Sequence, residues 1–267
     1  QVEAANRQLF YTLARLGLEP VPGRSGPVFE FLADWPGGPE VLTGHLGGTI
    51  TLNVAEADDD ERARRRIALG EPYRTLIGHL RHESGHFYWD QLVRDGGRLD
   101  AFRSVFGDER QDYAQALSAH YAKGNDLGDW AQCHVSAYAS AHPWEDWAET
   151  WAHYLHLVDT TEMASAFGLR LRPADDAQQD LTARIVFDPY ADGTVADLMD
   201  NWVPLSALIN NLNRAVGQPD AYPFVLTPAV VEKLDFIQTL VRNAGASQWT
   251  VPTPSGSEPI NAPGASR

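Results

Sequence analysis

The 267-residue chain is poor in cysteine, lysine and methionine, with one cysteine, two lysines and two methionines. The single cysteine, Cys133, excludes a disulfide framework within the chain and a zinc site built from four cysteines. No activating partner for this thiol is evident in the sequence. We therefore expect Cys133 to be a buried thiol rather than a nucleophile.

Positive charge and long apolar runs are also scarce. The 36 acidic and 21 basic residues give a net charge of −15, which argues against nucleic acid or an anionic membrane as a partner. No segment approaches the ~18 consecutive apolar residues that span a bilayer, and no signal peptide is visible. We therefore expect a cytoplasmic protein. A hydrophobic content of 43% and eight tryptophans are typical of a globular chain with a sizeable core.

One dense motif stands out, the pentapeptide His82-Glu83-Ser84-Gly85-His86, in a stretch whose apolar stripe predicts a helix. Positions i and i+4 of a helix share a face, so His82 and His86 can bind one Zn²⁺. Glu83 projects beside that metal, where it can take a proton from water. A hydrogen-bonded or solvated histidine pair is the alternative. His79, one turn earlier, cannot readily complete a tetrahedral site from the same straight helix, and we expect it to pack or to contact a ligand.

A second predicted helix, opened by Pro143, supplies the candidate third ligand. Glu145 and Glu149 are four residues apart and share a face, where two carboxylates repel unless a cation lies against them. We assign Glu145 to the metal and Glu149 to the free ring N–H of a ligating histidine, whose tautomer it would fix. The alternatives are the reverse assignment and a solvated acidic stripe. Against the stripe stand three tryptophans that should be buried, Trp144, Trp147 and Trp151.

These residues resemble known metallopeptidases. The gluzincins, zincins whose third ligand is a glutamate, pair H-E-x-x-H with E-x-x-x-D or E-x-x-x-E on a later helix. The 59 residues from His86 to Glu145 are within their range. A closer resemblance, over most of residues 1–245, is to the bacterial "putative zinc-binding metallopeptidase" family. It rests on segments similar to residues 47–58, 81–90, 136–149 and 212–217.

The resemblance implies an α+β, mostly helical, zincin-like metallopeptidase fold with a small sheet and a helical lower half. It implies one Zn²⁺ per chain, held by His82, His86 and Glu145, and hydrolysis of a peptide bond in a peptide or protein substrate. Two alternatives stay open: an amide hydrolase for a small modified peptide, and a non-catalytic binding or scaffold protein stabilised by zinc. Glu83 speaks against the scaffold, because a structural site has no use for a general base. The substrate and the oligomeric state stay open.

Tyr138 gains a role from the same resemblance. It lies seven residues before Glu145, the offset at which some gluzincins place an active-site tyrosine. We expect its phenol to stabilise the oxyanion of the reaction. A buried core tyrosine is the alternative.

The segment Thr49–Val54 alternates apolar and polar residues and predicts a strand. Because strands upstream of the metal helix commonly bind substrate in gluzincins, we expect an edge strand on the rim of the cleft. The Gly47-Gly48 pair would let a substrate backbone approach closely. An interior strand paired on both sides is the alternative. The residues expected to meet substrate are Thr49, Thr51 and Asn53.

We expect one domain over residues 1–245 and a disordered tail, rich in serine, proline, glycine and alanine, over 246–267. Family members commonly begin with a cysteine-rich zinc ribbon, which this chain lacks. Because it begins at Gln1 rather than methionine, we expect that a natural N-terminal segment has been removed. Strands are predicted at 28–34 and 49–54, and loops over 170–192. Helices are predicted near 3–17, 98–106, 109–123, 128–140, 142–159, 194–216 and 228–243.

Overall fold

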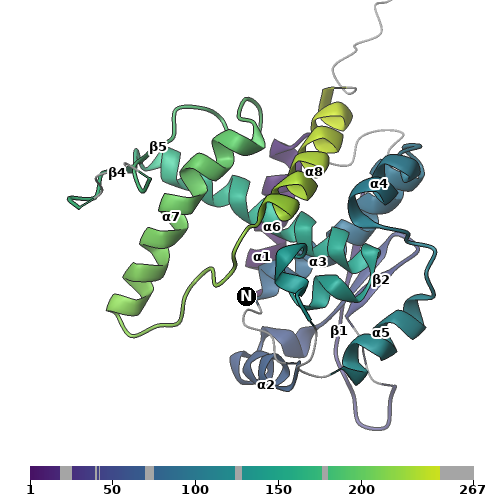
Figure 1. The fold of residues 1–267 in the computed structure, drawn as a ribbon. Helices are drawn as coiled ribbons and strands as arrows, with labels where there is room; N and C mark the ends of the chain where they lie inside the picture. The colour runs from purple at the N-terminus through teal and green to yellow at the C-terminus, as the bar shows by residue number, and fades with distance from the viewer. Residues whose placement is uncertain are drawn as a thin grey trace, which may run out of the picture.

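The computed structural model describes residues 1–18, 26–39, 41, 43–69, 75–123, 128–175 and 180–246. Within these ranges the chain is mostly helical, with a small sheet on one side (Figure 1). The predicted α+β, mostly helical class is confirmed. The helices are α1 (Val2–Arg15), α2 (Asp59–Leu69), α3 (Leu76–Trp89), α4 (Leu99–Phe106), α5 (Tyr113–Ala122), α6 (Pro143–Ala166), α7 (Val195–Ala215) and α8 (Pro228–Ala246).

The sheet has three strands in the order β1-β3-β2. β1 (Val28–Leu32) pairs in parallel with β3 (Thr49–Asn53), and β2 (Gly44–Leu46) pairs antiparallel with β3. The two-residue turn Gly47-Gly48 joins β2 to β3 with φ angles of 58° and 91°. A tight hairpin that needs positive φ at both central residues favours glycine there. A separate pair of short strands, β4 (Arg170–Leu171) and β5 (Ala183–Arg184), lies in the predicted loop region.

The expectation of an edge strand at residues 49–54 is wrong, because β3 is paired on both sides. The glycine pair forms the hairpin turn and does not make room for a substrate. Asn53 is buried, and its side chain bonds Asp34, the carbonyl of Val41 and the amide of Ala55. A substrate therefore cannot extend the sheet at β3, the strand that carries Thr49, Thr51 and Asn53. The three-residue β2 was too short for its pattern to be recognised in the sequence.

Helices α3 and α6 form the main packed pair of the core. Thr75 caps α3, its side chain accepting a hydrogen bond from Gly78 N at 3.0 Å, and a π-helical turn at Asp90–Arg94 continues the helix. Trp147 and Trp151 of α6 are fully buried. A buried tryptophan of this kind stabilises the fold by about 3–5 kcal/mol relative to alanine.

Gly85 sets how closely the two helices approach. A Cβ added there would lie 3.0 Å from Ala148 Cα and 3.2 Å from Trp151 Cβ, tighter than ordinary packing allows. Around this contact, Trp147 Nε1 donates to the Gly85 carbonyl at 2.8 Å, and Trp151 Nε1 donates to Ser84 Oγ at 3.1 Å. The small residues of the H-E-S-G-H segment thus bring its histidines within reach of α6.

The predicted helices correspond to observed ones except at 128–140. Two 3₁₀ turns, Trp130–Gln132 and Tyr138–Ala141, form there instead. Cys133 ends the first turn and is exposed, so the expectation of a buried thiol is wrong. The buried Lys233 bonds the backbone carbonyl of Cys133.

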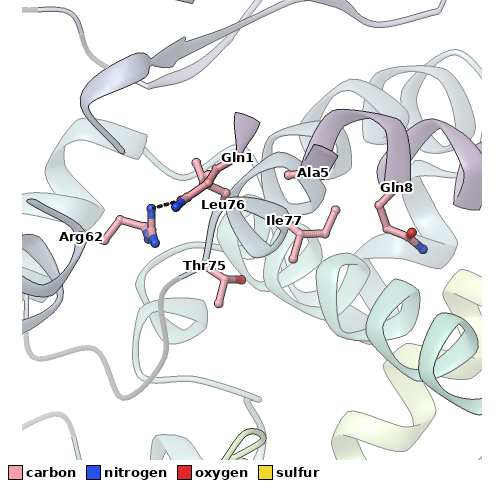
Figure 2. A pocket seen from close by; sticks show the side chains of 7 residues that line it. All are labelled: Gln1, Ala5, Gln8, Arg62, Thr75, Leu76 and Ile77. Atoms are coloured by element: carbon pink, nitrogen blue, oxygen red, sulfur yellow. Dashed lines mark hydrogen bonds between the residues drawn. The ribbon is translucent and has the colours of Figure 1, made fainter. Parts of the chain in front are cut away.

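None of the helices within the described ranges is long and apolar enough to cross a bilayer. Of the predicted tail, Ala246 is the last residue of α8 and 247–267 lie outside the described residues. A cavity of about 380 Å³ opens between α1, α2 and the start of α3 (Figure 2). None of the H-E-S-G-H residues lines this cavity. Its lining residues are Gln1, Ala5, Gln8, Arg62, Thr75, Leu76 and Ile77.

Candidate metal centre

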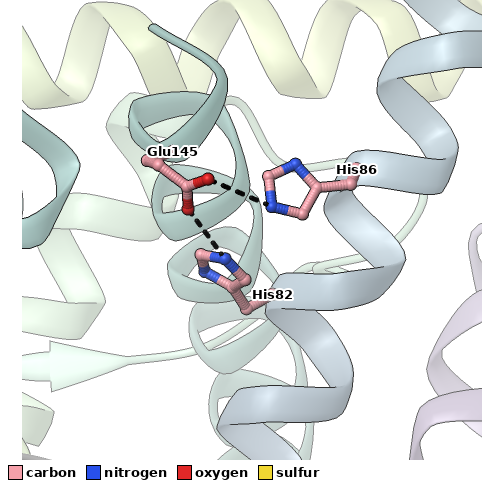
Figure 3. Close-up of side chains that lie close together, drawn as sticks. All are labelled: His82, His86 and Glu145. Carbon is pink, nitrogen blue, oxygen red and sulfur yellow. Dashed lines mark ion pairs between the residues drawn. The ribbon is translucent and has the colours of Figure 1, made fainter. Parts of the chain in front are cut away.

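Three side chains from α3 and α6 converge on one point (Figure 3). His82 and His86 lie one turn apart on α3, and Glu145 faces both of them from the first turn of α6. Glu145 Oε2 lies 3.1 Å from His82 Nε2, and Glu145 Oε1 lies 3.6 Å from His86 Nε2. One ligand atom from each side chain lies within 4.8 Å of the others. The predicted histidine pair and the predicted glutamate are thus brought together.

The chemistry of this group fits a zinc ion. Glu145 is 1% exposed, and its Oε2 accepts no hydrogen bond from the residues that the structure describes, an arrangement that is costly for a carboxylate unless a cation is near. Burial favours the neutral acid, yet the imidazoles of His82 and His86 hold the pKa of Glu145 well below its usual value. Two imidazoles and one carboxylate are a usual donor set for zinc with an open fourth position.

His82 is oriented from behind by α6. Its Nδ1 lies 2.8 Å from Glu149 Oε1, and Ser136 Oγ donates to the other oxygen of Glu149 at 2.7 Å. A protonated Nδ1 held by a carboxylate leaves the lone pair of Nε2 free for a metal. Burial lowers the pKa of His82, but without a metal Glu145 and Glu149 outweigh burial and hold it well above its usual value, so a metal that binds Nε2 must displace the second ring proton. The contact predicted for Glu149 is present, whereas Ser136 was not predicted.

Glu83 is buried on α3, next to His82 in the chain. Its charge reaches residues of two other elements. Burial lowers the pKa of His45 on β2, and Glu83 opposes that shift. Burial and Glu145 raise the pKa of Tyr113 on α5, and Glu83 adds to that rise. Glu83 thus follows the candidate ligand His82 directly on α3, and its charge acts on groups of β2 and α5.

Two tyrosines approach the same group. Tyr138 lies on the second 3₁₀ turn, with its ring centroid 6.0 Å from that of His82. Burial, and then the negative charge of Glu145, raise the pKa of Tyr138, so its phenol stays protonated. Tyr113, the first residue of α5, donates a hydrogen bond to Glu145 Oε1 at 2.7 Å. Asp112 marks the helix start as an N-cap, but no sequence pattern indicates that Tyr113 faces Glu145.

His79 is not part of the group. Its Nδ1 lies 2.5 Å from Oε2 of Glu56, a residue of the 3₁₀ turn Val54–Ala57 that follows β3. This agrees with the expectation that His79 is not a metal ligand, because its partner Glu56 lies next to the sheet and not on α6.

The fold and the site define an α+β protein with two histidines and one glutamate that could hold a metal ion, and the comparisons agree with that class. The model of the family described as "Putative zinc-binding metallo-peptidase" matches residues 1–240. Proteins of Mycobacterium tuberculosis and Mycobacterium bovis, both described as uncharacterized, are 43% identical over 249 residues, which cover 90% of this chain and 69% of theirs. No solved structure matches the chain. The chain belongs to this metallopeptidase family, as its motifs predicted.

Proposed function

We propose that the protein is a zinc-dependent metallopeptidase that hydrolyses a peptide bond with an activated water. The observation that carries the proposal is the buried carboxylate of Glu145, whose Oε2 faces His82 Nε2 and whose Oε1 faces His86 Nε2, while no hydrogen bond from the described residues reaches Oε2. Structural zinc sites are closed by four protein ligands, whereas catalytic sites have three and an open position. Three ligands with Glu83 beside them support a catalytic site over a structural one.

The chain supplies each role that the reaction needs. A zinc ion held by His82, His86 and Glu145 would acidify a bound water and polarise the scissile carbonyl. Glu83 takes the proton of the attacking water and returns it to the leaving amine. Tyr138 donates a hydrogen bond to the carbonyl oxygen as that atom gains negative charge.

An extended peptide or protein segment is the substrate that we propose. Among the described strands, β2 is the edge of the sheet on the side of α3, and the His45 ring of β2 lies edge-on to Phe87 of α3 at 6.1 Å. A peptide pairing with β2 would run beside the metal group, because main-chain bonds to a sheet edge hold extended substrates. The net charge of −15 disfavours nucleic acid and anionic membranes as partners.

Substitution of the general base tests the proposal. The Glu83→Gln variant should keep its zinc but lose hydrolysis by about 10²–10⁴-fold, because an amide cannot accept the proton of water at neutral pH. Cleavage of a peptide library, read by mass spectrometry, first gives a substrate for the kinetics. His79→Gln, on the same helix but paired with Glu56, is the matched control and should keep both zinc and activity. A Glu83→Gln variant with wild-type activity would exclude the mechanism.

A further inference from the structure

Helix α5 has no buried residue, although it lies beside the metal group. In the described part of the chain it packs mainly on the 3₁₀ turn Tyr138–Ala141, where the His120 ring lies 6.2 Å from that of Tyr138. Isolated helices of about ten residues are not stable in water. The few contacts that hold α5 in place therefore matter more than its own helical propensity.

Tyr113 provides one of these contacts and connects α5 to the start of α6. Its ring lies edge-on to His142, the N-cap of α6, at 5.3 Å, and to Trp144 at 6.3 Å. The residue is 39% exposed, yet its hydroxyl reaches inward to Glu145 Oε1. The ring therefore packs at the surface while the hydroxyl contacts a candidate metal ligand.

The two oxygens of Glu145 have different surroundings. Oε1 accepts the hydrogen bond from Tyr113 at 2.7 Å and lies 3.6 Å from His86 Nε2, whereas the buried Oε2 accepts no hydrogen bond from the described residues and lies 3.1 Å from His82 Nε2. A carboxylate that binds zinc through one oxygen is oriented by a hydrogen bond to the other, and such outer partners contribute 10–100-fold to metal affinity. This difference divides the carboxylate into an oxygen that is held and an oxygen that is free to bind.

We propose that Tyr113 is a positioning residue for the metal centre: its hydroxyl holds Glu145 Oε1 so that Oε2 faces the metal, and metal binding in turn docks α5. The inference rests on the proposed function, since it needs a metal bound by His82, His86 and Glu145. Coupling between two sites is reciprocal, so a contact that strengthens zinc binding must also be strengthened by zinc. α5 should therefore be better protected when zinc is bound.

Zinc affinity, measured by competition with a chromophoric chelator, tests the first half of the proposal. Tyr113→Phe keeps the ring against His142 and Trp144 but removes the hydroxyl, and it should weaken zinc binding by about 10–100-fold. Tyr11→Phe is the matched control, since it removes a tyrosine hydroxyl that also bonds a glutamate, Glu162, but lies on α1. That variant should bind zinc as the wild type does.

A double-mutant cycle distinguishes positioning from a general effect on the fold. In a Glu145→Ala background, Tyr113→Phe should have no further effect on zinc affinity, because the hydroxyl then has no carboxylate to hold. A similar loss in both backgrounds would overturn the proposal. Hydrogen exchange provides the second readout: zinc should slow exchange of the 113–122 amides in the wild type and not in Tyr113→Phe.

The outcomes separate this inference from the function on which it rests. Equal zinc affinity in the wild type and Tyr113→Phe would overturn the role of Tyr113 and leave the proposed function intact. A wild-type protein that binds no zinc would overturn both.

Discussion

Both halves of α6 present acidic side chains to α3, and two of these carboxylates, Glu145 and Asp159, have different surroundings. Glu145, near the start of α6, accepts a hydrogen bond at one oxygen and, among the described residues, none at the other. Asp159, in the second half of α6, has donors on both oxygens. They come from four side chains of three other regions: Gln8, Thr12, Arg81 and Tyr190.

The difference shows how a structural charge can be told from a candidate ligand. A buried carboxylate is tolerated when its oxygens are paired and is costly when they are not. Asp159 accepts hydrogen bonds at both oxygens and so joins α6 to α1, to α3 and to the segment at Tyr190, which stabilises the fold. Glu145, with one oxygen that accepts no hydrogen bond from the described residues, faces the ring nitrogens of His82 and His86, where a cation could bind. Two adjacent residues of α3 contact these two different carboxylates. Arg81 pairs with Asp159, and His82 faces Glu145.

Removing the charge of Asp159 should have the largest effect on stability. Asp159→Asn leaves the buried Arg81 without its ion-pair partner, and breaking one side of a buried pair costs about 3–5 kcal/mol. Urea unfolding measures the loss, and zinc content should not change. Glu3→Gln, which breaks an exposed pair with Arg7, is the control and should leave unfolding almost unchanged. A loss of zinc in folded Asp159→Asn would contradict the separation of the two clusters.

Protonation of His153 should make the protein sensitive to acid. His153 lies between the two clusters on α6, with Nδ1 2.6 Å from the Tyr222 hydroxyl, and burial lowers its pKa to about 4. The unfolded chain takes up this proton near pH 6.5, so the contribution of His153 is complete above that pH. It is lost as pH falls to about 4, by about 3 kcal/mol in all.

The non-titrating variant His153→Gln should remove that part of the pH dependence. Unfolding free energies of wild type and variant, measured between pH 7 and about 4, give the difference directly. The same slope in both proteins would show that His153 is not held neutral by burial.

The close contact between α3 and α6 should give the smallest effect. In Gly85→Ala the new Cβ would press on the backbone of Ala148 and on the buried Trp151. Overpacking costs about 1–3 kcal/mol, and the higher helix propensity of alanine returns up to about 1 kcal/mol. We expect a net loss of about 1 kcal/mol in urea unfolding. A gain in stability would show that the helices have room to spare.

The parts of the site that follow from local pattern could be predicted from the sequence. The i, i+4 spacing places His82 and His86 on one face of α3, and the spacing of Glu145 and Glu149 does the same on α6. Ser136 and Tyr113 could not be predicted, because they reach the site through turns and a short helix that carry no periodic signal. The donors to Asp159 lie up to 151 residues away in the chain, beyond any local pattern.

The fold shows the same division. The long helices were predicted from apolar periodicity, because each buries one stripe against α3 or α6. The three-residue β2 was missed, and so β3 was taken for an edge. Residues 128–140 were expected to be one helix, but they form two 3₁₀ turns and a connecting loop, in which Val135, Ser136 and Ala139 are buried. Tertiary contacts of these kinds cannot be read from a single sequence.

The zinc content of three purified proteins tests the central claim most directly. Wild type, Glu145→Ala and Asp159→Asn would be equilibrated at nanomolar free zinc and measured by elemental analysis. The account predicts one zinc per chain in the wild type and in Asp159→Asn, and loss of zinc from Glu145→Ala, because three protein ligands are needed to hold the ion tightly. Full zinc retention in Glu145→Ala would contradict the claim that the carboxylate of Glu145 is a metal ligand.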